Sequence, residues 1–311
     1  GAGRVAAGIL LQGFVSLEVI ADDSMVAPPP ASLDDTITAL DQLKDLAVQR
    51  KAVMMQIVHG SRDSELTNLL SERGRSEVAH GRMLAGKDPE DVWGWGSPAG
   101  RLRAKRRAAL IASGAGLAPD VRAIEIGCGT GLFTEMFAAS GAHIIAVDLS
   151  PELLAVARQL RLANVEFREQ AFEECDVDGP FDAVIGSSVL HHLDLARAWP
   201  KILALLKPGG RLSVAEPNML NPQVFCERRF RRFFPYVSPD ETASVRGRLR
   251  RDLERAGFTS ISIVPFDWLH PSTPAPLIPA VRRAGAVLER VWPVREFAGS
   301  LSIRATRPVE N

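Results

Sequence analysis

Three glycines at alternate positions and one aspartate carry the clearest chemistry in this sequence. Gly127, Gly129 and Gly131 follow the short apolar run 121–126, and Asp148 follows the next apolar run, 143–147. Glycine lets the backbone turn tightly and approach a ligand closely, because no Cβ is in the way. An acidic residue after the second strand can accept hydrogen bonds from both hydroxyls of a ribose. The pattern therefore predicts a ribose-containing ligand at the carboxyl ends of two strands.

The spacing of the glycines bears on which cofactor is bound. A dinucleotide-binding loop has the spacing Gly-x-Gly-x-x-Gly, and here Leu132 stands where its last glycine would be. An NAD-dependent dehydrogenase is therefore a poor alternative.

The motifs resemble those of a known family. Glu125-Ile-Gly-Cys-Gly-Thr-Gly131 with Val147-Asp148 resembles the first two motifs of class I S-adenosylmethionine-dependent methyltransferases. The later motifs, which resemble the small-molecule (methyltransferase type 11-like) branch over about 102–216, are Phe181-Asp-Ala-Val184, Ser188-Val-Leu-His-His-Leu193 and Leu206-Lys-Pro-Gly-Gly-Arg211. The resemblance implies S-adenosyl-L-methionine as cofactor and a small molecule as methyl acceptor, with O-methylation slightly favoured over N- or C-methylation.

The resemblance also implies individual cofactor contacts. Glu125 and the loop 127–131 would hold the methionine end of the cofactor. Asp148 would hold the ribose, and Leu149 would pack on the adenine. Residues 187–189 would line the cofactor from the fourth strand. The candidates are Glu125, Gly127, Cys128, Gly129, Gly131, Asp148, Leu149, Ser187 and Ser188.

The adenine contacts depart from the family pattern. The family often places an aspartate near the adenine amino group, but residues 169–173 read Glu-Gln-Ala-Phe-Glu. Gln170 could present a side-chain oxygen instead, with Ala171 and Phe172 completing this wall. Trp95, in the Trp-Gly-Trp-Gly stretch 93–96, is a further candidate for cofactor contact, and simple packing is the alternative.

Three side chains are candidates for the chemical step. A hydroxyl acceptor benefits from a base with a near-neutral pKa, and the acceptor must lie in line with the methyl group. His191 and His192 follow the fourth strand, and adjacent side chains point differently, so we expect at most one to reach the acceptor. Glu216, at the end of the fifth strand, could bind or deprotonate the acceptor. Packing or helix capping is the alternative for the histidines, and ordinary loop chemistry for Glu216.

Two long insertions are expected to shape the acceptor site. The first, about 217–243, interleaves arginines with aromatic residues, and the second covers about 266–297. Guanidinium groups there would suit an anionic or amphiphilic acceptor. The alternative is an amphipathic lid whose arginines are solvated or paired. The arginines of the first insertion are Arg228, Arg229, Arg231 and Arg232. The helix that follows carries Arg246, Arg248, Arg250 and Arg251.

The elements that must position these residues form an alternating series. From about residue 102, helical stretches alternate with short apolar strands, which predicts a Rossmann-like, doubly wound, mostly parallel seven-stranded α/β sheet. The expected strands are 121–126, 143–147, 165–168, 183–186, 211–215, 259–264 and 300–304. The expected helices are 101–115, 132–140, 151–162, 195–206, 244–256 and 277–291.

The first hundred residues are interpreted separately. We interpret residues 1–24 as an added or upstream segment, and 25–100 as an N-terminal helical cap with the Trp-Gly loop. Apolar residues at helical spacing predict an amphipathic helix over 33–59, through which a homo-oligomer could form, and a weaker helix over 63–84. The methyltransferase domain is expected over 101–311.

The composition of the chain limits which partners it could bind and indicates the cellular compartment. The 37 basic and 37 acidic residues cancel, and the motifs of nucleic-acid amino and cytosine C5 methyltransferases are absent, so no nucleic-acid partner is expected. Three cysteines far apart predict no metal site and a reducing cytoplasm. The apolar run 5–14 is too short to span a membrane.

Two functional alternatives stay open. The cofactor could serve another transfer, such as aminopropyl transfer, or the chain could be a non-catalytic cofactor-binding subunit of a partner. Formation of S-adenosylhomocysteine would separate the first alternative from methyl transfer. Cofactor binding with turnover only in a complex would favour the second.

Overall fold

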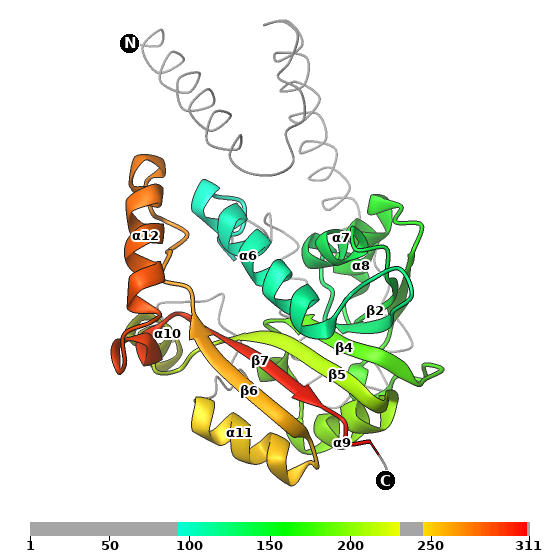
Figure 1. Cartoon of the computed structure of the whole chain (residues 1–311). Coiled ribbons are helices and arrows are strands. Elements are labelled where there is room, and N and C mark those ends of the chain that lie inside the picture. Colours follow the sequence, from blue (N-terminus) through cyan, green and yellow to red (C-terminus); the bar gives the residue numbers. More distant parts are fainter. Residues whose placement is uncertain (1–92, 231–244, 310–311) are drawn as a thin grey trace, which may run out of the picture.

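The fold was analysed in a computed structural model, which describes residues 93–230 and 245–309 (Figure 1). The predicted helices over 33–59 and 63–84, the segment 1–24 and the insertion residues 231–243 lie outside the described residues.

A seven-stranded sheet forms the centre of the fold, with the order β3-β2-β1-β4-β5-β7-β6. Its strands are β1 (Arg122–Ile126), β2 (His143–Asp148), β3 (Val165–Glu169), β4 (Phe181–Ser187), β5 (Leu206–Pro217), β6 (Thr259–Phe266) and β7 (Ser300–Thr306). Strands β1 to β5 pair in parallel, and β7 runs antiparallel to both of its neighbours, β5 and β6. The prediction of a mostly parallel seven-stranded sheet is confirmed.

Helices cover both faces of this sheet. They are α6 (Pro98–Ala115), α7 (Leu132–Ala138), α8 (Pro151–Ala157), α9 (Leu195–Leu205), α10 (Pro222–Arg229), α11 (Arg246–Arg255) and α12 (Ile278–Leu288). Helices α6, α7 and α8 supply the core on one face, and α9 and α11 supply the core on the other. The side chains of β1 alternate between these cores: Ile124 and Ile126 face α9, whereas Ala123 faces α6 and α7.

The helix expected over 151–162 ends at Ala157 and continues as a 3₁₀ turn to Leu160, and two other helices also differ from the sequence expectation. Helix α6 begins at Pro98 rather than 101, because the Ser97 hydroxyl accepts a hydrogen bond from the Gly100 N–H at 2.9 Å and Pro98 suits the first turn. Helix α10 was not predicted, because its cap, Asn221, and Pro222 lie within the stretch interpreted as an insertion that shapes the acceptor site.

The topology brings the candidate residues to one edge. The carboxyl ends of parallel strands lie at the same side of the sheet, so the loop 127–131, Asp148, Gln170 and residues 187–192 are neighbours. Strand β7 is antiparallel, so its first residue, Ser300, lies at this edge too. Within the described ranges, no helix is long and apolar enough to cross a membrane.

Candidate active site

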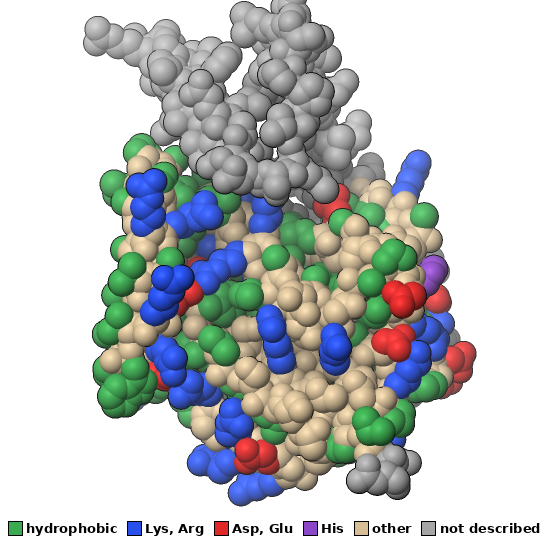
Figure 2. Space-filling model, in the orientation of Figure 1, with side chains coloured by type: hydrophobic (Ala, Val, Ile, Leu, Met, Phe, Trp, Pro, Cys, Tyr) green, Lys and Arg blue, Asp and Glu red, His purple; other side chains and the backbone are tan. Residues whose placement is uncertain are grey.

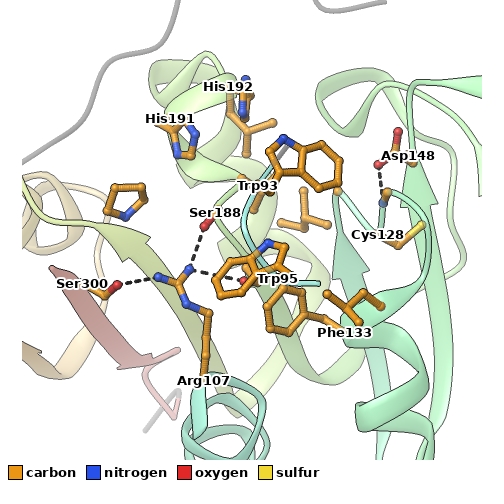
Figure 3. A pocket seen from close by; sticks show the side chains of 18 of the residues that line it. Trp93, Trp95, Arg107, Cys128, Phe133, Asp148, Ser188, His191, His192 and Ser300 are labelled. Carbon is orange, nitrogen blue, oxygen red and sulfur yellow. Dashed lines mark hydrogen bonds between the residues drawn. The ribbon is translucent and has the colours of Figure 1, made fainter. Parts of the chain in front are cut away.

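A cavity of about 860 Å³ lies at this edge of the sheet. It collects side chains from the β1 loop and from the ends of β2 and β4 (Figure 3). The end of β3 and both insertions also contribute to its lining. The predicted site residues that line it are Trp95, Gly127, Cys128, Gly129, Asp148, Leu149, Gln170, Ala171, Phe172, Ser187, Ser188, His191 and His192.

The glycine loop is shaped by its backbone and by Asp148. Gly127 has φ +66°, and a Cβ there would lie 2.5 Å from the Cγ2 atom of Val189. Gly129 has φ +53°, and a Cβ there would meet no other atom within 4 Å. The Asp148 carboxylate accepts hydrogen bonds from the N–H of Gly129 at 2.7 Å and of Ser150 at 2.9 Å. Asp148 thus holds the loop in place, and each carboxylate oxygen keeps a further acceptor site for a ribose hydroxyl.

The residues at the end of β3 fit the adenine end of the cofactor. The Oε1 atom of Gln170 is buried and makes no hydrogen bond with any described residue. An adenine amino group is a donor that would satisfy this acceptor, and a buried polar atom left without a partner is costly. Phe172, which is buried, and Leu149 line the adjoining wall. The residues present therefore fit S-adenosylmethionine.

Two predicted cofactor contacts lie behind the cavity wall instead. Gly131 is the N-cap residue of α7, and a Cβ there would lie 2.6 Å from the Leu160 Cδ1 atom, so this position is closely packed. Glu125 alternates with Ile124 and Ile126 toward the α7 face and is only 1% exposed. Burial raises the pKa of Glu125 to about 8, although the Thr134 hydroxyl opposes this shift. Neither residue lines the cavity.

A histidine and a glutamate form a buried pair beside the cavity. The Nδ1 atom of His191 lies 2.6 Å from the Oε2 atom of Glu216, and the other carboxylate oxygen accepts from the N–H groups of Val189 and Leu190. Burial would raise the pKa of Glu216, but His191 and the backbone donors outweigh it and hold that pKa below its ordinary value. Glu216, which was expected to bind or deprotonate the acceptor, does not line the cavity, and its carboxylate contacts His191 instead.

Both histidines line the cavity. The expectation that at most one of them reaches the acceptor stays a prediction. That expectation assumed an extended chain, whereas Leu190–His192 is a short 3₁₀ turn. Adjacent side chains diverge less in such a turn, and the two ring centroids lie 4.2 Å apart.

Sequence reasoning missed Arg107, a buried arginine of α6 (Figure 3). Its guanidinium donates hydrogen bonds to the hydroxyls of Ser188 at 2.7 Å and Ser300 at 2.6 Å, and to the Ala215 carbonyl at 3.2 Å. Ser188 adopts φ +56°, a left-handed conformation that is unusual for serine. The sequence offered a signal for this arginine. At helical spacing it falls on the same face as the apolar residues 104, 108 and 111, which predicts that it is buried.

The insertions form the end of the cavity near β7. Asp267, which follows β6 with φ +78°, pairs with Arg103 at 2.7 Å. His270 lies within hydrogen-bonding distance of Gln223 on α10, at 2.8 Å, and Trp268 completes this wall. The Trp95 ring lies edge-on to Phe133, with the centroids 5.4 Å apart.

The predicted arginine cluster divides in the structure. Arg228 lines the cavity, whereas Arg246, Arg248 and Arg250 pair with acidic residues on the α11 side. On the face shown in Figure 2, Lys and Arg side chains are spread among apolar and acidic ones. The described part of the chain holds no group of three or more His, Cys, Asp or Glu residues suited to a metal ion.

Comparison with known proteins agrees with this geometry. Residues 123–210 match the family described as a methyltransferase domain. Over 103 residues the chain is 43% identical to a ubiquinone biosynthesis O-methyltransferase of Xylella fastidiosa (strain 9a5c), covering 31% of this chain and 42% of that protein. Over 106 residues it is 40% identical to the protein of that name from Xanthomonas campestris pv. campestris (strain B100), covering 32% and 44%. The chain thus spans less than half the length of these relatives.

Solved structures share the fold at low sequence identity. A phosphoethanolamine N-methyltransferase 2 of Haemonchus contortus superposes with TM-score 0.54 and 16% identity, covering 77% of this chain and 61% of that one. The N-methyltransferase NodS of Bradyrhizobium japonicum, in complex with S-adenosylhomocysteine, superposes with TM-score 0.50 and 20% identity, covering 75% and 98%. Residues 123–210 are therefore similar to a methyltransferase domain, and the chain shares the fold of these solved methyltransferase structures.

Proposed function

We propose that this chain transfers a methyl group from S-adenosylmethionine to an oxygen of a small-molecule acceptor, with His191 as the general base. One observation carries the proposal: the His191–Glu216 pair, joined at 2.6 Å, adjoins the cavity that also holds the glycine loop and Asp148. The relatives named O-methyltransferases support oxygen as the acceptor atom.

The proposed mechanism assigns one task to each group. When bound, S-adenosylmethionine supplies an electrophilic methyl group on its sulfonium sulfur. Asp148 would bind the ribose, Gln170 the adenine amino group, and the loop 127–129 the methionine end. Glu216, kept ionised by its lowered pKa, accepts the Nδ1–H of His191 and so leaves the basic lone pair on Nε2. Nε2 would then take the acceptor's hydroxyl proton as the oxygen attacks.

The proposal can be tested with two single variants, His191→Ala and His192→Ala. Formation of S-adenosylhomocysteine is measured with a panel of phenols, amines and carbon acids, and turnover is expected on the phenols. His191→Ala should lower kcat by about 10²- to 10⁴-fold, the usual contribution of a general base, while the Kd for S-adenosylhomocysteine stays unchanged. His192→Ala is the matched control, with a smaller loss of kcat.

The variant Glu216→Gln tests whether Glu216 positions His191. The variant should lower kcat and change its pH dependence, because an amide does not stabilise the imidazolium as a carboxylate does. Turnover on amines alone, or a native rate in His191→Ala, would contradict a histidine base acting on a hydroxyl acceptor.

Two further expectations stay part of the proposal. A reducing, cytoplasmic location fits the free thiols of Cys128, Cys175 and Cys226. A homo-oligomer formed through the helix expected over 33–59 stays a prediction, since that segment lies outside the described residues.

A further inference from the structure

Arg107 is a buried cation that has no ionic partner among the described residues. Its side chain is 2% exposed, and its four hydrogen bonds go to three serine hydroxyls and one carbonyl, with no carboxylate among the described residues. Its Nε atom makes no hydrogen bond with the described part of the chain. Burial of a charge is costly unless an opposite charge compensates it, so this arrangement suits an anion from outside the protein.

The carboxylates near Arg107 have other partners. Asp267 pairs with Arg103 at 2.7 Å, and the oxygens of Glu216 are taken by His191 and two backbone N–H groups. Burial and the neighbouring Arg103 lower the pKa of Arg107 to about 10, although Asp267 and Glu216 oppose this shift. The guanidinium is therefore still charged at neutral pH.

The serines beside Arg107 are arranged to donate. Ser188 and Ser300 each accept a hydrogen bond from the guanidinium, and neither hydroxyl donates one to any described residue. A hydroxyl that accepts from a cation keeps its own proton for another acceptor. Two O–H groups and the guanidinium charge together form a set of donors for a carboxylate.

Apart from Ser188, which was a candidate for cofactor contact, this set lies away from the groups expected to bind the ribose and the adenine. Arg107 lies on α6, Ser188 follows β4 and Ser300 begins β7, whereas Asp148 ends β2, on the other side of β1. The guanidinium carbon also lies 5.5 Å from the centroid of the Trp95 ring (Figure 3). An aromatic ring next to a cation favours a flat, apolar ligand body that carries a negative group.

We propose that Arg107, Ser188 and Ser300 bind a carboxylate of the methyl acceptor, so that the acceptor is an aromatic hydroxy acid. This inference rests on the proposed function, which places the acceptor in this half of the cavity. The tryptophan and phenylalanine side chains of the cavity, which include Trp93, Trp95, Phe133 and Trp268, would contact its ring.

Binding to two matched probes tests this proposal without turnover. The full-length chain, saturated with S-adenosylhomocysteine, is titrated calorimetrically with 3,4-dihydroxybenzoate and with 3,4-dihydroxybenzamide, which share the ring and hydroxyls but differ in charge. The native chain should prefer the carboxylate by about 10-fold or more, the usual effect of a charge-assisted hydrogen bond. Arg107→Gln should reduce that preference to about threefold or less, and Arg107→Lys should retain part of it.

Two serine variants, one as the test and one as the control, keep the proposal testable if Arg107→Gln does not fold. Ser300→Ala should weaken carboxylate binding about three- to tenfold and leave amide binding unchanged. Ser213→Ala removes another buried hydroxyl, outside the cavity, and should change neither affinity. Equal affinity of the native chain for both probes, or no measurable binding of either, would overturn the proposal.

The methionine carboxylate of the cofactor is the rival source of this anion. Affinities for S-adenosylhomocysteine and for 5′-methylthioadenosine, which lacks the amino-acid group, separate the two. If Arg107 held the cofactor, Arg107→Gln would weaken only S-adenosylhomocysteine and the probe preference would persist, which would overturn an acceptor site. A native chain that prefers the carboxylate probe but forms no methylated product would contradict the proposed function and leave the anion site standing.

Discussion

Three carboxylates around the cavity differ in role because their partners differ. Asp148 accepts from backbone N–H groups of the glycine loop, and Glu216 accepts from His191. Glu125 faces the α7 core, where burial raises its pKa to about 8. At neutral pH Glu125 is therefore largely protonated, whereas Glu216 is ionised, although both belong to strands that end at the same edge.

Glu125 should make folding stability fall as pH rises. The unfolded chain releases the Glu125 proton near the ordinary pKa of 4.5, but the folded chain holds it up to about 8. The contribution is therefore full below pH 4.5 and is lost as pH rises toward 8. The free energy of unfolding, measured by urea titration without cofactor, should decline relative to Glu125→Gln by about 1.4 kcal/mol per pH unit within this window.

All other titrating groups are shared by the native chain and this variant, so the difference between them isolates Glu125. Parallel curves of unfolding free energy from pH 5 to 8 would show that Glu125 ionises normally in the folded chain.

At the scale of elements, the turn from β1 to α7 uses its glycines for different purposes. Gly129 faces open space at the cavity, whereas Gly131 is pressed against α8 and the turn that follows it. Both have positive φ, so both share the backbone cost of a non-glycine residue. The two glycines differ only in what a Cβ would meet: open space in the cavity at Gly129, and neighbouring side chains at Gly131.

Alanine at these two positions should separate binding from stability. Gly131→Ala should lower the free energy of unfolding by about 2–4 kcal/mol, since left-handed strain adds to a 2.6 Å contact with Leu160. Gly129→Ala should cost about 1–2 kcal/mol but abolish calorimetric binding of S-adenosylhomocysteine, because its Cβ enters the cavity. Gly247→Ala, on α11 with nothing within 4 Å, is the control and should change neither quantity appreciably. Intact cofactor binding by Gly129→Ala would contradict the place assigned to the cofactor.

At the scale of the whole molecule, α6 is linked by two ion pairs to the second insertion, about 266–297. Arg103 pairs with Asp267, and Arg106 pairs with Glu289 beyond α12. These pairs hold the second insertion over the end of the cavity near β7. They differ in exposure: the Asp267 side chain is 4% exposed, whereas Arg106 is 47% exposed.

This difference predicts unequal effects on stability. Arg103→Ala leaves a buried carboxylate without its partner and should lower the free energy of unfolding by about 3–5 kcal/mol. Arg106→Ala breaks a solvent-screened pair and should cost about 1 kcal/mol or less. Urea titration of both variants measures the contrast, and equal losses would show that the buried pair does not anchor the insertion.

Much of the fold followed from local pattern. Apolar runs and their alternation predicted all seven strands, and most expected boundaries lay within a few residues of the observed ones. The edge that carries the site also followed, since parallel strands place their carboxyl ends together. Helix α10 and the early start of α6 were missed, because capping by Asn221 and Ser97 is a contact of single side chains.

The sequence by itself determined the sheet, the glycine loop and the acid that follows β2, because each depends on residues close together in the chain. Only the tertiary structure decided which side chains reach the cavity. Glu216 contacts His191 outside the cavity lining, and Gly131 packs against Leu160. Arg107 donates a hydrogen bond to Ser300, which lies 193 residues later in the chain. Contacts over such separations depend on how helices pack on both faces of the sheet, and no local pattern encodes that packing.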